Sequence, residues 1–87
     1  MRKMDNKVLI RLYVPNIEKS YDVWIPVQRR ITNVIILLLK AINEMNFNIY
    51  KPRFFPMLYN KDTAEMYDPN LLVKDANIRN GSEIIIF

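Results

Sequence analysis

One segment of the chain has the apolar repeat of an amphipathic helix, whereas the other segments have the patterns of strands and turns. The helical segment runs from Ile31 to Met45, and at about 100° per residue most of its apolar side chains share one face. The residues on this face are Ile31, Val34, Ile35, Leu38, Ala41, Ile42 and Met45. The hydroxyl of Thr32 is the predicted N-cap. Asn46 is predicted to end the helix in the left-handed conformation, so that Phe47 folds back onto Ile42.

Three more apolar residues of this segment lie away from the centre of that face. Leu37 and Leu39 flank it, and Ile36 lies on the polar side. Two interpretations of Ile36 remain open. It packs against Ile31 as a hydrophobic staple, or it is exposed and marks a contact site, and single exposed apolar residues are common.

The N-terminal part of the chain alternates between apolar and polar residues, which is typical of half-buried strands. Lys7–Val14 is the first such strand and Tyr21–Val27 is the second. The loop around Pro15–Lys19 is short enough to join them as a hairpin. Pro26 cannot donate to a strand ladder, so we expect it at a strand end or on a sheet edge.

The C-terminal half is predicted to contain short elements. The connection 47–56 holds two prolines and is predicted to be irregular. The sequence then predicts a short strand at Met57–Tyr59, a turn at 60–63, a further short strand at Ala64–Tyr67, a compact turn within Leu71–Ile78, and a tight turn at Asn80-Gly81. Glu83–Phe87 is continuously apolar after its first residue, which favours a central strand.

This order of elements predicts an α+β fold of the β-grasp type, in one domain covering residues 1–87. We expect a mixed sheet of four to five strands with one main helix packed on one face, and the last strand parallel to the first in the middle of the sheet. The predicted core consists of Val8, Ile10, Leu12, Val23, Ile25, Val34, Leu38, Ile42, Ile78, Ile84 and Ile86.

The composition argues against an enzyme. The chain contains no Cys and no His, which removes the usual general base, the thiol nucleophile and most zinc ligands. A single glycine cannot form a phosphate-binding loop, so no cofactor is expected. No apolar run approaches the about 20 residues of a membrane span, and no secretory signal is recognised, so a cytoplasmic location is expected. The net charge of +4 is spread along the chain.

The end of the chain resembles ubiquitin-like proteins. Asp75, Ile78, Asn80-Gly81 and Ile84 are similar in spacing to the ending of the bacterial YukD/EsaB family, ubiquitin-like proteins associated with type VII secretion. Ile31–Val34 and Leu38 also resemble the start of the ubiquitin-like helix. The resemblance implies a cytoplasmic accessory or regulator that docks on a membrane-embedded secretion complex. Ubiquitin and sulfur carriers end in Gly-Gly, but this sequence ends in Ile-Ile-Ile-Phe, so conjugation is not expected.

Surplus apolar and aromatic residues give the candidate partner contacts, which are Trp24, Ile36, Leu39, Tyr50, Lys51, Arg53 and Phe54. For the segment 50–55 one interpretation is that Phe54 and Phe55 close the core beneath the helix; the others are a protein contact or a single-strand nucleic-acid site. Trp24 is expected to face outward, as a binding anchor or in a contact with Arg11 or Tyr13. A homodimer, a ubiquitin-like adaptor for another protein and, less favoured, a nucleic-acid-binding domain are the alternatives.

Overall fold

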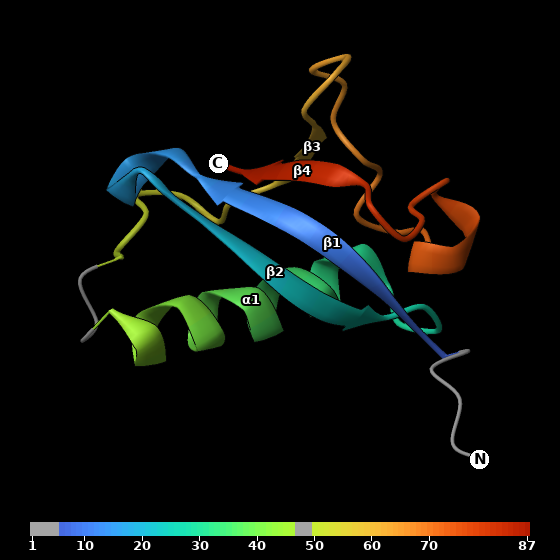
Figure 1. Ribbon diagram of the computed structural model, residues 1–87, viewed down its shortest axis with the longest axis horizontal. Helices are drawn as coiled ribbons and strands as arrows, with labels where there is room; N and C mark the ends of the chain where they lie inside the picture. The colour runs from blue at the N-terminus through green and yellow to red at the C-terminus, as the bar shows by residue number, and fades with distance from the viewer. Residues whose placement is uncertain (1–5, 47–49) are drawn as a thin grey trace.

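The computed structural model describes residues 6–46 and 50–87 and has one main helix packed across one face of a four-stranded sheet (Figure 1). The elements in chain order are β1 (Lys7–Val14), the 3-10 helix η1 (Pro15–Ile17), β2 (Lys19–Pro26), α1 (Ile31–Met45), β3 (Leu58–Asn60), the 3-10 helix η2 (Val73–Asp75) and β4 (Glu83–Ile86). The strands lie in the order β2-β1-β4-β3. The predicted β-grasp fold is confirmed, and α1 has the predicted bounds.

The first two strands form the predicted hairpin. β1 and β2 pair antiparallel, with Leu12 opposite Tyr21. The turn closes because Glu18 takes the left-handed conformation at φ 54° and its N–H donates to the carbonyl of Pro15 at 3.1 Å. β2 begins two residues before the predicted alternation, and it ends at Pro26, in agreement with the expectation that this proline lies at a strand end.

The last strand lies in the centre of the sheet, as predicted. β4 pairs parallel with β1, with Leu12 opposite Ile84, and antiparallel with β3. Gly81 leads into β4 at φ +88°, a conformation that favours glycine, and its N–H donates to the carbonyl of Leu9 at 2.8 Å. Ile84 and Ile86 are buried beneath the helix, whereas Ile85 is half-buried on the other face of the sheet.

The core lies between the inner face of the sheet and α1. All residues of the predicted core except Val8 and Val23 are buried, and those two are partly buried against it. Sequence analysis did not assign several further buried residues to the core, and these are Val14, Ile31, Ile35, Tyr50, Leu58 and Val73. Val14 continues the apolar face of β1, and Ile31 and Ile35 continue that of α1. Tyr50 comes from the connection after α1, Leu58 from β3 and Val73 from η2.

The start of α1 differs from the prediction, because Thr32 is not its N-cap. The cap position is Arg30, and no side chain caps the helix there. The free N–H groups of Ile31 and Thr32 instead donate to the carbonyls of Leu71 and Pro69, at 2.9 and 3.0 Å. A distant loop therefore supplies the acceptors that a local hydroxyl was expected to supply.

The end of α1 also differs from the prediction. Asn46 has φ −124°, which is not the left-handed conformation. Its side chain is buried, and Nδ2 donates to the carbonyl of Ile42 and to the hydroxyl of Tyr21, both at 2.7 Å. The helix therefore ends on a side-chain link to β2. The predicted packing of Phe47 lies outside the described residues.

The segment after β3 forms less strand than predicted. β3 lies one residue later than expected, and the predicted strand at 64–67 is reduced to a single bridge between Tyr59 and Met66. Ala64 has φ 65°, which interrupts any extended run there. This loop projects from the top of the view in Figure 1. The predicted compact turn within 71–78 is present as η2.

Tyr50 is the largest fully buried side chain, at 1% exposure. Its hydroxyl is buried and has no hydrogen-bond partner in the described part of the chain. Burial raises the pKa of Tyr50 above its ordinary value of 10.0, because the charged phenolate loses solvation. The hydroxyl therefore costs stability that a phenyl ring at the same place would not.

Replacing Asn46 with Ala is expected to lower the free energy of unfolding by about 1–3 kcal/mol, since a buried carbonyl and the Tyr21 hydroxyl both lose a donor. Tyr21→Phe removes only one of these hydrogen bonds and is expected to cost about 1 kcal/mol. Urea unfolding of both variants measures the difference. Equal losses in the two variants would contradict the proposed link to the end of the helix.

Replacing Tyr50 with Phe is expected to raise the free energy of unfolding at neutral pH by about 1 kcal/mol. The raised pKa adds a pH dependence: the native protein holds its stability below pH 10 and loses it as the pH rises further, because only the unfolded state ionises readily there. Tyr50→Phe should lose less stability above pH 10. A destabilised Tyr50→Phe protein would instead indicate a polar partner for the hydroxyl.

Candidate protein-interaction surface

The described residues offer no cluster of side chains that could hold a metal ion. Among residues 6–46 and 50–87 no three His, Cys, Asp or Glu side chains gather as a possible metal site. In the same part of the chain no helix is long and apolar enough to cross a membrane. What the protein does present is exposed aromatic surface, and the segment that follows α1 carries much of it.

Two anchors hold this segment against the rest of the protein. At its start the N–H of Tyr50 donates to the Oδ1 of Asn43 on α1 at 2.9 Å, and the Tyr50 ring is buried. At its end Met57 and Phe87 exchange two backbone hydrogen bonds, of 3.2 and 3.0 Å. The residues between the anchors are therefore held at the end of the sheet, next to the last residues of the chain.

Around these anchors the protein exposes several aromatic side chains, two of them between the anchors and two beside them. Phe54 is 79% exposed and Phe87 is 65% exposed, while Phe55 is about half exposed and Tyr59 is half-buried. We call these four residues the aromatic surface. A single exposed apolar residue needs no explanation, but several large ones together are typical of a binding surface.

Two hollows adjoin the aromatic surface, and Tyr59 and Phe87 line both of them. The larger measures about 420 Å³ and is also lined by Asn16, Tyr50, Pro52, Arg53, Phe54, Phe55, Pro56 and Met57. The smaller measures about 310 Å³ and is completed by Pro15, Ala64 and Ile85. The guanidinium of Arg53 lies 5.9 Å from the centre of the Phe54 ring, so one basic group accompanies the aromatic rings. This combination of aromatic rings and arginine is enriched at the centres of protein interfaces.

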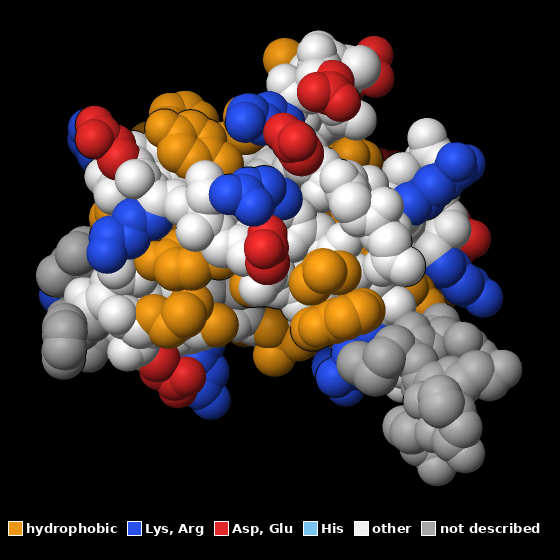
Figure 2. All heavy atoms as spheres, in the orientation of Figure 1, with side chains coloured by type: hydrophobic (Ala, Val, Ile, Leu, Met, Phe, Trp, Pro, Cys, Tyr) orange, Lys and Arg blue, Asp and Glu red, His pale blue; other side chains and the backbone are white. Residues whose placement is uncertain are grey.

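The outer face of the sheet is divided by a row of charges that alternates in sign from strand to strand. Arg11 pairs with Asp22 of β2 at 3.2 Å and stands opposite Glu83 of β4, which in turn pairs with Lys61 at 3.4 Å. Figure 2 shows these blue and red side chains along the middle of the face, with hydrophobic side chains on either side. Both ion pairs are solvent-exposed and contribute little stability, but they separate the apolar surfaces on their two sides.

The structure brings together only part of the predicted contact set. Arg53 and Phe54 lie at the aromatic surface, and Lys51 is exposed close to it in sequence. Tyr50 is a core residue, so its prediction as a surface contact is wrong. The expectation that Phe54 and Phe55 close the core is also wrong, because Tyr50 fills that place and leaves both Phe side chains outside.

The remaining predicted contacts lie elsewhere on the molecule. Ile36 is 53% exposed, so the staple interpretation is wrong, and Leu39 is half-buried against the core. Trp24 faces outward as expected, but its neighbour on β1 is Leu9 and neither Arg11 nor Tyr13. Sequence reasoning missed Phe55, Tyr59 and Phe87 as surface contacts. In an all-apolar final strand no alternation separated an outward residue from an inward one.

No model of a protein family matches the chain, and no curated protein matches it in sequence. Solved structures do match in fold. The ubiquitin-like domain of EccD5 from Mycobacterium xenopi is 16% identical with a TM-score of 0.77, and the match covers 93% of this chain and 92% of that one. The ubiquitin-like domain of the Mycobacterium tuberculosis type VII secretion system protein EccD1 is 9% identical with a TM-score of 0.74, covering 92% and 96%.

A third match is to a chain of the MycP5-free ESX-5 inner membrane complex, in its State II. It is 12% identical with a TM-score of 0.78, and the match covers 94% of this chain but only 21% of that one. This chain therefore spans about a fifth of the length of its counterpart in that complex. Identities this low establish the architecture and leave the activity open. From its strand order, its helix and these matches, the chain has the ubiquitin-like β-grasp fold.

Proposed function

We propose that this chain is a non-catalytic protein-interaction module, and that it serves as a cytoplasmic accessory of a bacterial type VII secretion system. The observation that carries the interaction role is the aromatic surface with its two adjoining hollows. Aromatic rings supply large contact area at little cost in conformational entropy, because their side chains have few rotatable bonds. The absence of Cys and His from the sequence supports a role in docking without chemistry.

The assignment to secretion has two supports. The first is the likeness in fold to two ubiquitin-like domains, one of them from a type VII secretion system protein, and to a chain of an inner membrane complex. The second is the resemblance of Asp75, Ile78, Asn80-Gly81 and Ile84 to the ending of the YukD/EsaB family. We therefore propose a membrane-embedded secretion complex as the partner. An adaptor for an unrelated protein target is the competing function, since one fold hosts many partners.

A pull-down from membranes of the source cell distinguishes the secretion accessory from the unrelated adaptor. Tagged protein should recover a component of the secretion complex, identified by mass spectrometry. Deletion of the protein should change the amount of secreted substrate in the culture medium. Recovery of some other protein, together with unchanged secretion after deletion, would leave only the unrelated adaptor.

Replacing Phe54 and Phe55 together with Ser is expected to weaken recovery of the partner at least about tenfold, because central aromatic anchors carry most of the binding energy of an interface. Both residues are exposed, so the free energy of unfolding should change by less than about 0.5 kcal/mol. Leu71→Ser is the control, since Leu71 is 39% exposed and lines neither hollow of the aromatic surface. Full recovery of the partner by the double variant would exclude the aromatic surface as its binding site.

A further inference from the structure

The two edge strands of the sheet differ in whether their outer backbone groups are hydrogen-bonded. On the outer side of β3 the following loop supplies hydrogen bonds: the N–H of Asn60 donates to the carbonyl of Glu65 and the N–H of Tyr67 donates to that of Leu58, both at 2.8 Å. That edge is therefore closed by the chain itself. β2 forms the opposite edge, and no strand of the described residues lies beyond it.

The hydrogen-bond alternation of β2 identifies which backbone groups are open. The N–H of Val27 donates to the carbonyl of Asn6 on the β1 side at 2.9 Å, so the odd-numbered residues of β2 face β1. The N–H and C=O groups of Ser20, Asp22 and Trp24 then point away from the sheet. Within residues 6–46 and 50–87 these groups have no backbone partner. An unpaired row of this kind is a template for another strand.

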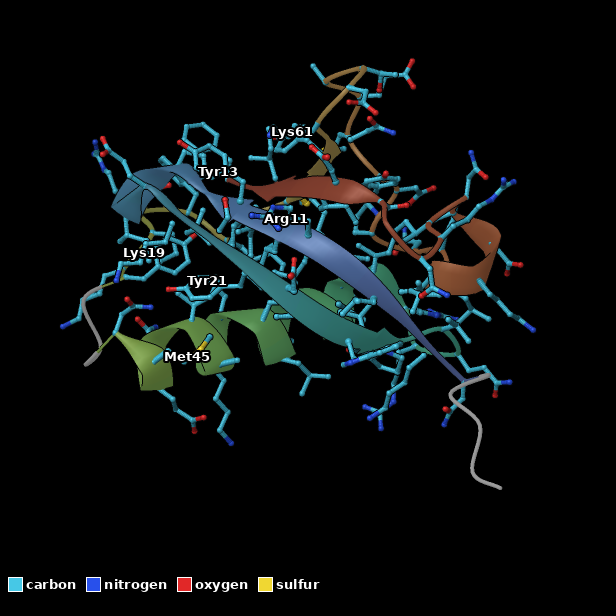
Figure 3. All side chains as sticks on the ribbon, in the orientation of Figure 1. Arg11, Tyr13, Lys19, Tyr21, Met45 and Lys61 are labelled. Atoms are coloured by element: carbon cyan, nitrogen blue, oxygen red, sulfur yellow. The ribbon has the colours of Figure 1, made fainter. Side chains whose placement is uncertain are left out.

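α1 places a row of apolar side chains beside this open edge. Leu37, Ala41 and Met45 recur every four residues along α1 and so form one stripe. Leu37 is 45% exposed and Met45 is 50% exposed, too much for residues that only serve the core. Figure 3 places Met45 close to Tyr21 of β2, whose hydroxyl accepts the hydrogen bond from Asn46. β2 and α1 are thus fixed relative to each other along this stripe.

At the Pro26 end of β2, a hollow of about 490 Å³ lies between the strand and Leu37 of the helical stripe. Its apolar lining comes from Trp24, Pro26 and Leu37, and Trp24 is 47% exposed. Among the described residues that line it, the charged ones are Lys7 and Arg29, and both are basic. At the other end of the open edge lies the exposed Lys19, labelled in Figure 3. Asp22 lies between these two ends and is paired with Arg11. The basic groups at the two ends therefore favour a segment with acidic residues at its ends.

We propose that β2 binds an extended segment of a partner protein as a fifth strand. Because successive side chains of a strand point to opposite faces of the sheet, one apolar side chain of the segment lies against Trp24 on the outer face and the next lies against Leu37 of α1. An acidic side chain lies beside Lys7 and Arg29. The backbone of the segment bonds to Ser20, Asp22 and Trp24. Lys19 and Pro26 limit the paired stretch to the residues between them. This surface is separate from the aromatic surface, so a single partner could engage one without the other.

A second copy of this chain fits the edge less well than a foreign segment. In an antiparallel pairing of two copies, the register that uses all three open residues sets Asp22 opposite Asp22 of the other copy, and like charges directly opposite are unfavourable. Each Asp22 has Arg11 beside it, but each copy also carries a net charge of +4. A foreign segment with an apolar residue opposite Asp22 and acidic residues at its ends meets neither repulsion. Single-stranded nucleic acid stacks on several aromatic side chains, whereas Trp24 is the one aromatic residue among the described residues that line this hollow.

The proposal is tested with a palindromic probe peptide, acetyl-DEVLVLVED-amide, which reads the same whether it pairs parallel or antiparallel. In a ¹⁵N NMR titration the amide signals of Ser20, Asp22 and Trp24 and the indole signal of Trp24 should shift together and saturate below about 1 mM. The same peptide with Lys at every acidic position should not bind. Absence of saturable shifts from the acidic peptide, or shifts centred on Phe54 and Phe55, would overturn the proposal.

Backbone pairing is tested by two methylated forms of the probe, one carrying N-methyl groups on its Val residues and the other on its Leu residues. In a strand only every second N–H faces β2, so one form should lose about tenfold or more in affinity and the other should keep most of it. Equal losses in both forms, or no loss in either, would overturn strand addition. Amide shifts that depend on protein concentration without peptide would indicate pairing between copies and would also overturn the proposal.

The charge preference is tested with Arg29→Glu and the matched control Lys40→Glu, which makes the same charge change on an exposed site of α1 outside the hollow. Arg29→Glu should weaken binding of the acidic probe at least about fivefold, whereas Lys40→Glu should change it less than about twofold. Similar losses in both variants would show a response to net charge alone and would overturn the assigned contact. A pull-down from membranes with the Arg29→Glu protein tests the proposed secretion role separately from the binding of the probe peptide.

Discussion

The rest of the fold depends on the parallel pairing of β1 with β4 in the middle of the sheet. These strands are the first and last elements of the chain, and Leu12 and Ile84 lie opposite each other with both side chains fully buried. Polar groups outside the strands strengthen the junction: the N–H of Arg11 donates to the carbonyl of Ser82, and the Oδ1 of Asn80 accepts from Leu9. β1 and β4 thus occupy the middle of the sheet. Since β2 pairs with the other side of β1 and β3 with the other side of β4, β2 and β3 form the two edges.

That arrangement also decides where the protein can interact. One face of the sheet is covered by α1, and the other carries a row of alternating charges with apolar surfaces on its two sides. The β3 edge is closed by its own loop, while the β2 edge is left open beside an exposed helical stripe. The aromatic surface lies where the connection after α1 meets the last residues of the chain. The domain thus offers two distinct surfaces for the proposed contacts.

The hydrogen bonds at the two ends of α1 differ from those that the neighbouring residues predict. Thr32 had the chemistry of a cap, yet the carbonyls of Leu71 and Pro69 satisfy the first turn. Asn46 had the chemistry of a left-handed end, yet its side chain is used to join Ile42 and Tyr21. At the start of the helix, two hydrogen bonds to a distant loop replaced the local cap. At its end, the Asn46 side chain bonds both to the nearby carbonyl of Ile42 and to Tyr21 on β2. The residues next to each helix end do not reveal which distant groups come within reach.

The sequence by itself determined the elements whose apolar periods are long: α1 with its bounds, the hairpin of β1 and β2, and the central final strand. The buried face of each element is defined by many residues together, so a single residue that departs from the apolar period does not change the prediction. The exposure of the residues from Tyr50 to Phe55 was decided only by the tertiary structure, because one aromatic side chain fills the space under the helix and the others are then left outside. In the same way, only the assembled sheet decided which edge is open, since a strand's free hydrogen bonds depend on which neighbours the rest of the chain brings to it.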